Sequence, residues 1–167
     1  MRQSTVLVRS VASDTAHGAA KLYHRKRVLA ADTPEGIETL RNVLEPAIQV
    51  FSASSMRDAF DLLRHEVDLL VCGIHFDNSR MFDVLRIVKS HPAVQHKRIL
   101  CYRDRALDLP AVLPQGLTIA CTAMGAIDFV DLHALKQQFG ARIAHAQFLA
   151  IVLRCLSSNN KSVKTCF

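Results

Sequence analysis

The residues of this chain that could do chemistry are few and scattered. Asp32 follows the short strand expected at 27–31, and Asp77 lies in a polar loop shortly after the apolar run 69–72. The cysteines are widely spaced, odd in number and without a C-x-x-C pair: Cys72, Cys101, Cys121, Cys155 and Cys166. No H-E-x-x-H motif occurs, and the sequence offers no set of nucleophile, base and orienting group. This pattern predicts a protein that is not an enzyme, has no cofactor or zinc site, and works in a reducing, cytoplasmic compartment.

Composition predicts one globular domain with extra tails. The chain has 167 residues, of which 50% are hydrophobic and 22% charged. Its apolar stretches fall well short of the ~18 residues of a membrane span. Lys and Arg number 21 against 15 Asp and Glu, a formal charge of +6. The basic residues form two clusters, Lys21, His24, Arg25, Lys26 and Arg27 in one and Lys97, Arg98, Arg103 and Arg105 in the other. No nucleic-acid recognition motif accompanies them, so we expect solvated surfaces and no nucleic-acid partner.

The elements that must position these residues alternate between strands and helices. Strands are expected at 27–31, 48–51, 69–72, 98–102 and 127–132, and helices at 34–44, from 54, from 79, at 117–124 and, as one long helix, from 133. Thr33 and Pro34 suit a helix N-cap and first turn. Five such units predict an α/β fold with a doubly wound parallel sheet.

Two segments carry a family resemblance. Residues 67–84 read VDLLVCGIHFDNSRMFDV, and the segment around the fifth strand contains Gly125, Ala126, Asp128 and Phe129. With the strand and helix pattern, these segments resemble the response-regulator receiver family over residues 27–156. The resemblance implies a flavodoxin-like five-stranded parallel sheet with strand order 2-1-3-4-5 and a ligand site at the carboxyl ends of the strands. Residues 108–116 exceed the family's usual length and predict an extra loop.

At the family's chemical positions the resemblance implies a degenerate site. The phosphate-accepting aspartate falls on Gly73, and Asp32 alone remains of the acidic pair that holds Mg²⁺. Tyr102 and Phe129 fall on the switch positions, and Leu132 replaces the phosphate-pairing lysine. Asp32 could retain weak metal binding or only favour the positive end of the first helix.

Asp77 is the other acidic residue near this site. It lies four residues beyond Gly73, outside the strand. We expect it to cap the helix that begins at Ser79 and not to replace the missing acceptor.

The last helix predicts a partner surface. Residues 148–153 are apolar on every side, whereas a helix on one face of a sheet buries only one stripe. Phe148, Ile151 and Val152 are therefore the candidate interface residues; packing under the N-terminal arm or the 108–116 loop is the alternative. The receiver resemblance implies docking of a protein partner or a second copy through the fourth helix, fifth strand and last helix. The expected organisation is a flexible arm, 1–25, a receiver-like domain, 26–156, and a flexible tail, 157–167.

These observations favour a non-phosphorylatable receiver-like interaction module in bacterial signalling. The alternative is a receiver-derived module that binds a small anionic ligand or nucleotide at the carboxyl ends of the strands.

Overall fold

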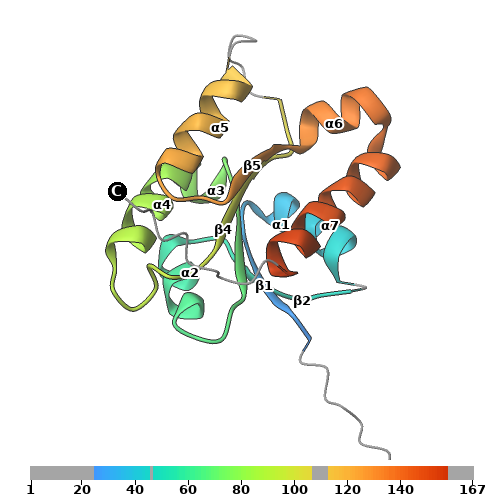
Figure 1. The fold of residues 1–167 in the computed structure, drawn as a ribbon. Coiled ribbons are helices and arrows are strands. Elements are labelled where there is room, and N and C mark those ends of the chain that lie inside the picture. The colour runs from blue at the N-terminus through green and yellow to red at the C-terminus, as the bar shows by residue number, and fades with distance from the viewer. Residues whose placement is uncertain (1–24, 46, 107–112, 158–167) are drawn as a thin grey trace, which may run out of the picture.

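The computed structural model describes residues 25–45, 47–106 and 113–157, which contain a five-stranded parallel sheet. Its order is β2-β1-β3-β4-β5, the order that the receiver resemblance implied (Figure 1). The strands are β1 (Arg27–Ala31), β2 (Gln49–Ala53), β3 (Leu69–Gly73), β4 (Ile99–Arg103) and β5 (Asp128–Asp131). The predicted fold class is confirmed.

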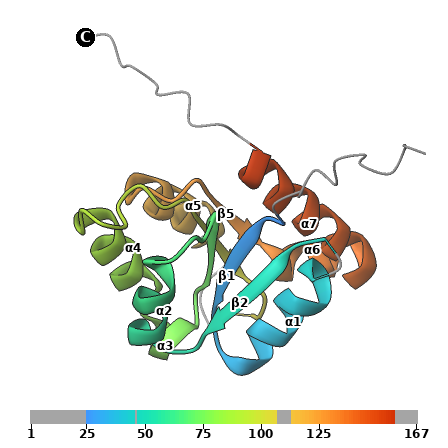
Figure 2. The same cartoon turned by 90° about the horizontal axis from the view of Figure 1, so that it is seen from below.

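Helices cover both faces of the sheet (Figure 2). One face carries α1 (Pro34–Leu44) and α7 (Ala141–Ser157), and α6 (Leu132–Phe139) precedes α7. The other face carries α2 (Met56–Leu63), the short α3 (Phe76–Ser79), α4 (Met81–Ser90) and α5 (Leu113–Ala123). In the described part of the chain, no helix is long and apolar enough to cross a membrane.

The core consists of two layers separated by the sheet. All five residues of β3 are buried because this strand lies at the centre of the sheet, with helices on both faces. Alternate strand residues enter opposite layers: Leu70 and Cys72 pack towards α2, α4 and α5, and Leu69 and Val71 pack towards α1 and α7. The unbroken apolar run of β3 therefore follows from its two-sided burial.

The helix starts follow the expected capping chemistry. The Thr33 hydroxyl accepts a hydrogen bond from the Gly36 backbone N–H at 3.3 Å, and Pro34 begins α1. The Ser55 hydroxyl accepts from the Asp58 N–H at 3.2 Å at the start of α2. These caps fix the residues at which α1 begins after β1 and α2 begins after β2.

The expected single long helix is wrong. Gly140, with φ of +78°, separates α6 from α7, and this left-handed backbone, which glycine adopts without strain, ends one helix before the next begins. Figure 1 shows α6 running away from the sheet and α7 returning along it.

Three other expected segments lie largely beyond what the structure describes. The expected arm and tail fall outside the described residues except for Arg25 and Ser157, and Ser157 closes α7 instead of opening a tail. Of the expected loop at 108–116, residues 108–112 also fall outside, and α5 begins at Leu113.

Candidate functional site

Three residues form a row across the carboxyl end of the sheet. Gly73 is the last residue of β3 and pairs in register with Tyr102 of β4. On its other side, Ala31 of β1 pairs with Cys72, so that Asp32 comes next to Gly73. In this row Tyr102 packs towards α1 and α7. The sheet therefore brings together Asp32, Gly73 and Tyr102, three of the residues that the sequence singled out.

Gly73 leaves the space that the carboxylate of Asp32 occupies. A Cβ atom at position 73 would lie 2.1 Å from Oδ2 of Asp32 and 2.3 Å from its Cγ. Gly36 in α1 makes a similar approach, because a Cβ there would lie 2.3 Å from the same oxygen. The Asp32 side chain thus lies between two glycines. A side chain at position 36 or 73 would overlap with it unless Asp32 moved.

Tyr102 closes this pocket from the side of β4. Its hydroxyl donates a short hydrogen bond to Oδ2 of Asp32, and the Gly36 carbonyl oxygen lies 3.5 Å from the same hydroxyl. The ring is fully buried and contacts Phe148 of α7 with ring centroids 5.5 Å apart. A buried tyrosine needs a partner for its hydroxyl, and Asp32 supplies it.

The electrostatics of Asp32 follow from its enclosure. Burial raises the pKa of this carboxyl above its ordinary value, because the charged form loses water. The hydrogen bonds from Tyr102 and the Thr33 backbone N–H, and the charges of His75 and Arg105, oppose that rise without cancelling it. Burial and the adjacent carboxylate likewise raise the pKa of Tyr102. Both groups are therefore biased towards their protonated, neutral forms.

The chemistry open to this row is limited. Gly73 supplies no nucleophile, and the single carboxylate beside it is buried and bonded to Tyr102. Among the described residues, no group of three or more His, Cys, Asp or Glu side chains is placed to hold a metal ion. The row is arranged to join β1, β3 and β4, not to present oxygen ligands to solvent.

Around the row, basic side chains are paired with acids. Arg105 lies 3.1 Å from both the Glu35 carboxylate and the Thr33 hydroxyl. Arg103 binds both carboxylate oxygens of Asp131, and Lys136 of α6 binds Asp104. The four side chains of the Arg103–Asp131 and Lys136–Asp104 pairs are largely buried. These two ion pairs therefore fix the start of α6 against the end of β4.

The remaining family positions are core residues. Leu132 is fully buried, at the first position of α6 and not in β5 as expected, and it packs in the layer of α1 and α7. Phe129 is buried on the opposite face with Cys101 and Cys121. Neither side chain extends into the Asp32 pocket.

Asp77 has a different role from the one expected. Its carboxylate accepts a hydrogen bond from the Met56 backbone N–H at 3.0 Å, so it caps α2 and not the helix after Ser79. Asp77, Asn78 and Ser79 all have positive φ, so the short α3 departs from regular helical geometry at these residues. The prediction that Asp77 caps the following helix is wrong.

The interface residues expected in α7 also need correction. Phe148 and Val152 are fully buried against the sheet, and Ile151 is partly buried against the same layer. The stripe of α7 that faces the core is Ala144, Phe148, Val152, Cys155 and Leu156, spaced by three or four residues. Sequence alone did not reveal which face this was, because the neighbouring residues are apolar too.

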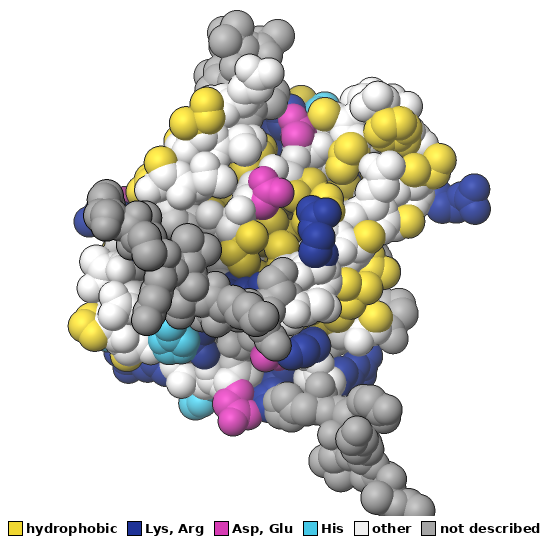
Figure 3. All heavy atoms as spheres, in the orientation of Figure 1, with side chains coloured by type: hydrophobic (Ala, Val, Ile, Leu, Met, Phe, Trp, Pro, Cys, Tyr) yellow, Lys and Arg dark blue, Asp and Glu magenta, His cyan; other side chains and the backbone are white. Residues whose placement is uncertain are grey.

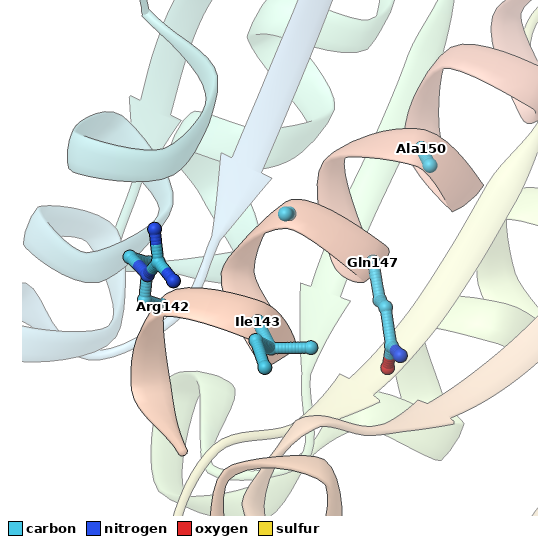
Figure 4. Close-up of a pocket in the computed structure, with 5 residues that line it drawn as sticks. Arg142, Ile143, Gln147 and Ala150 are labelled. Carbon is cyan, nitrogen blue, oxygen red and sulfur yellow. The ribbon is translucent and has the colours of Figure 1, made fainter. Parts of the chain in front are cut away.

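Other apolar side chains are exposed along α5, β5, α6 and α7. Ile119 of α5 is 69% exposed, Ile127 before β5 is 43% exposed and Ile143 of α7 is 45% exposed; Phe139 and Leu153 are exposed as well. Figure 3 shows hydrophobic side chains on both sides of this face, with acidic and basic side chains between them. Ile143 also lines a shallow hollow of about 470 Å³ on α7 with Arg142, Ala146, Gln147 and Ala150 (Figure 4).

Known proteins resemble this chain in structure. No protein-family model matches the sequence, and no curated protein matches it. A response regulator from Hahella chejuensis is 24% identical with a TM-score of 0.61, covering 82% of this chain and 99% of its own. A response regulator from Thermotoga maritima is 19% identical with a TM-score of 0.59, covering 80% and 99%. The signal receiver domain of a histidine kinase from Syntrophus aciditrophicus is 16% identical with a TM-score of 0.59, covering 86% and 98%.

These similarities agree with the strand order and the helix layers described above. They extend over almost the whole length of each solved receiver domain. At these identities the likeness concerns the backbone fold. The chain therefore has the receiver fold. Gly73, Tyr102 and Leu132 occupy three positions at which the resemblance in sequence led us to expect the family's chemical groups.

Proposed function

We propose that this protein is a pseudo-receiver, a module of bacterial signalling that docks a protein partner without accepting a phosphoryl group. The observation that carries the proposal is the contact between Gly73 and Asp32. The acceptor position has no side chain, and the carboxylate of Asp32 fills the place where one would begin. The hydrogen bond from Tyr102 holds that carboxylate there.

The partner would dock on the face formed by α5, β5 and α7. This face corresponds to the fourth helix, fifth strand and last helix of the sequence analysis. It exposes Ile119, Ile127 and Ile143. Burying such a side chain on association contributes ~1.5–3 kcal/mol before ordering costs, so a few of them suffice for a specific complex.

The anionic-ligand alternative has less support. A small anion at the carboxyl ends of the strands needs cationic groups that are available to it, whereas Arg103, Arg105 and Lys136 are each paired with a carboxylate.

Incubation with acetyl phosphate and Mg²⁺ tests the absence of phosphoryl transfer. We expect the intact mass to remain unchanged, and Gly73→Asp to remain inert because its carboxylate would overlap with Asp32. An acid-labile phosphoryl adduct on Asp32 or Asp77 of the natural sequence would contradict the proposal.

Docking is tested by changing the exposed face and a matched control. Ile119→Asp and Ile143→Asp should each release a co-purifying partner or split a dimer in analytical ultracentrifugation, without loss of the folded circular dichroism spectrum. Phe82→Asp is the control, since Phe82 is 37% exposed on α4, away from this face. Equal assembly in all three variants would exclude this face as the docking surface.

A further inference from the structure

The two basic clusters of the sequence separate in the structure. Arg103 and Arg105 follow β4 at the carboxyl edge of the sheet, where both are paired with acids. Lys97 and Arg98 precede β4 at the opposite edge, where β1 also begins with Arg27. Because parallel strands all start at the same edge of a sheet, Lys97 and Arg98 lie at the same edge as Arg25, Lys26 and Arg27.

Direct contacts confirm that the loops at this edge adjoin one another. The ammonium group of Lys97 donates to the backbone oxygens of His65 at 2.9 Å and Val67 at 3.3 Å. The Arg27 backbone N–H donates to the Asp68 carboxylate at 2.8 Å. These bonds tie the starts of β1, β3 and β4 into one surface.

The end of α7 adds a further cation. Arg154 lies in the last turn of α7, and its charge and that of Arg98 oppose the rise that burial causes in the pKa of Cys155. By their positions at the starts of β1 and β4 and at the ends of α2 and α7, seven basic residues lie at this edge. We call this group the basic edge: Arg25, Lys26, Arg27, Arg64, Lys97, Arg98 and Arg154. Figure 3 shows Lys and Arg side chains gathered at the lower end of the molecule, where this edge lies.

Acids at this edge are fewer and mostly engaged. They are Glu45, Glu66, Asp68 and Asp128. Glu66 pairs with the Arg27 side chain, Asp68 accepts a hydrogen bond from the Arg27 backbone N–H, and Asp128 accepts one from the Phe129 backbone N–H. The described chain also begins and ends here, at Arg25 and Ser157. Among the described residues, basic side chains thus outnumber acidic ones at this edge of the sheet.

We propose that the basic edge binds the phosphate backbone of nucleic acid without reading its sequence. A surface rich in Lys and Arg attracts the phosphate backbone electrostatically, and Lys and Arg contacts to phosphates need no helix in a groove. The expectation of two solvated clusters and no nucleic-acid partner is the competing interpretation. The inference is independent of the docking face on α5, β5 and α7.

Fluorescence anisotropy of the full chain with a labelled, mixed-sequence DNA duplex tests the proposal. The test variant is Lys26→Glu with Arg64→Glu, two exposed residues of the basic edge. The matched control is Arg57→Glu with Arg142→Glu, which makes the same change of charge at exposed residues elsewhere; Arg57 lies at the other end of α2 from Arg64.

The natural sequence should bind in a salt-dependent manner and equally well to unrelated duplexes. The test variant should bind on the order of ten-fold more weakly, and its slope of log affinity against log salt should be smaller by about 2, as expected when two phosphate contacts are lost. The control should bind within about two-fold of the natural sequence, because its substitutions change the net charge equally but lie outside the basic edge. If the double glutamate variant does not fold, Lys26→Gln with Arg64→Gln replaces it, with the same order of affinities expected.

Three outcomes would overturn the proposal. The natural sequence does not bind DNA even at low salt; the test and control variants lose affinity equally, so that only net charge matters; or the protein binds phosphatidylserine vesicles but not DNA, so that the edge serves a membrane surface. A loss of DNA binding by Lys26→Glu with Arg64→Glu that leaves α5–β5–α7 docking intact would separate this site from the proposed partner face.

Discussion

The Tyr102 hydroxyl at the end of β4 donates a hydrogen bond to Asp32 after β1, although β3 lies between those two strands. The residue of β3 at this level is Gly73. Only the absence of a side chain there permits the two groups to meet across the strand. The glycine at the end of β3 and the tyrosine at the end of β4 are thus two parts of one arrangement.

Removing the Tyr102 hydroxyl should weaken the fold. Tyr102→Phe leaves the buried Asp32 carboxyl without its strongest side-chain partner, and we expect a loss of about 1–3 kcal/mol in the free energy of unfolding. Urea denaturation measures it. In an Asp32→Ala background the same substitution should cost clearly less; an equal cost in both backgrounds would show that packing of the ring, not the hydrogen bond, is responsible.

The raised pKa of Asp32 predicts an unusual dependence of stability on pH. The folded protein holds this proton more tightly than the unfolded chain, whose ordinary value is 3.8. The stability that this group contributes is therefore fully present below pH 3.8 and is lost as the pH rises through the raised folded value. The difference in unfolding free energy between the natural sequence and Asp32→Asn should fall over that range. A difference that grows with pH would mean that Asp32 is ionised and stabilised in the fold.

Position 73 should tolerate no side chain at its present geometry. Gly73→Ala places a Cβ against the Asp32 carboxylate, which can rotate away only by giving up its bonds to Tyr102 and Thr33, so we expect a loss of about 1–3 kcal/mol. Gly116→Ala is the control, because no atom lies within 4 Å of a Cβ there and the site is within α5. That substitution should stabilise by about 0.4–1 kcal/mol. Thermal denaturation of the two variants checks both signs, and similar stabilities would contradict the crowding argument.

The same substitution should change stability by very different amounts at two adjacent residues of α7. Val152 is fully buried and Leu153 is 40% exposed. Val152→Asp buries a carboxyl group in the layer between α1 and the sheet and should cost about 4 kcal/mol or more, whereas Leu153→Asp should change stability by about 0.5 kcal/mol or less. Circular dichroism melting curves measure both. A stable Val152→Asp variant would place this residue on the surface, as the sequence analysis had it.

The sequence predicted the five strand and helix units because their signals are local. The continuous apolar run of β3, the Thr33 cap and the Pro34 start each depend on a few adjacent residues. The strand order came from the resemblance, and the structure confirms it. Gly73, Asp32 and Tyr102 were singled out separately, as family positions.

What the sequence did not provide was the contact between distant residues. Asp32 and Tyr102 are 70 positions apart, and Asp77 caps a helix that begins 21 residues before it. One signal could have suggested the first pair, since a glycine in a buried strand often marks the close approach of another group, and a buried tyrosine needs a partner. The exposed face of α7 had no such signal, because apolar residues surround that helix on all sides.

The enclosure of Asp32 also fixes the order in which this sequence could change. An acidic residue introduced first at position 73 would place a second carboxyl group directly against that of Asp32. Tyr102 or Asp32 would have to change beforehand, and each of those steps alone removes a partner from a buried polar group. An acidic residue at position 73 could therefore be reached by single substitutions only through a less stable intermediate.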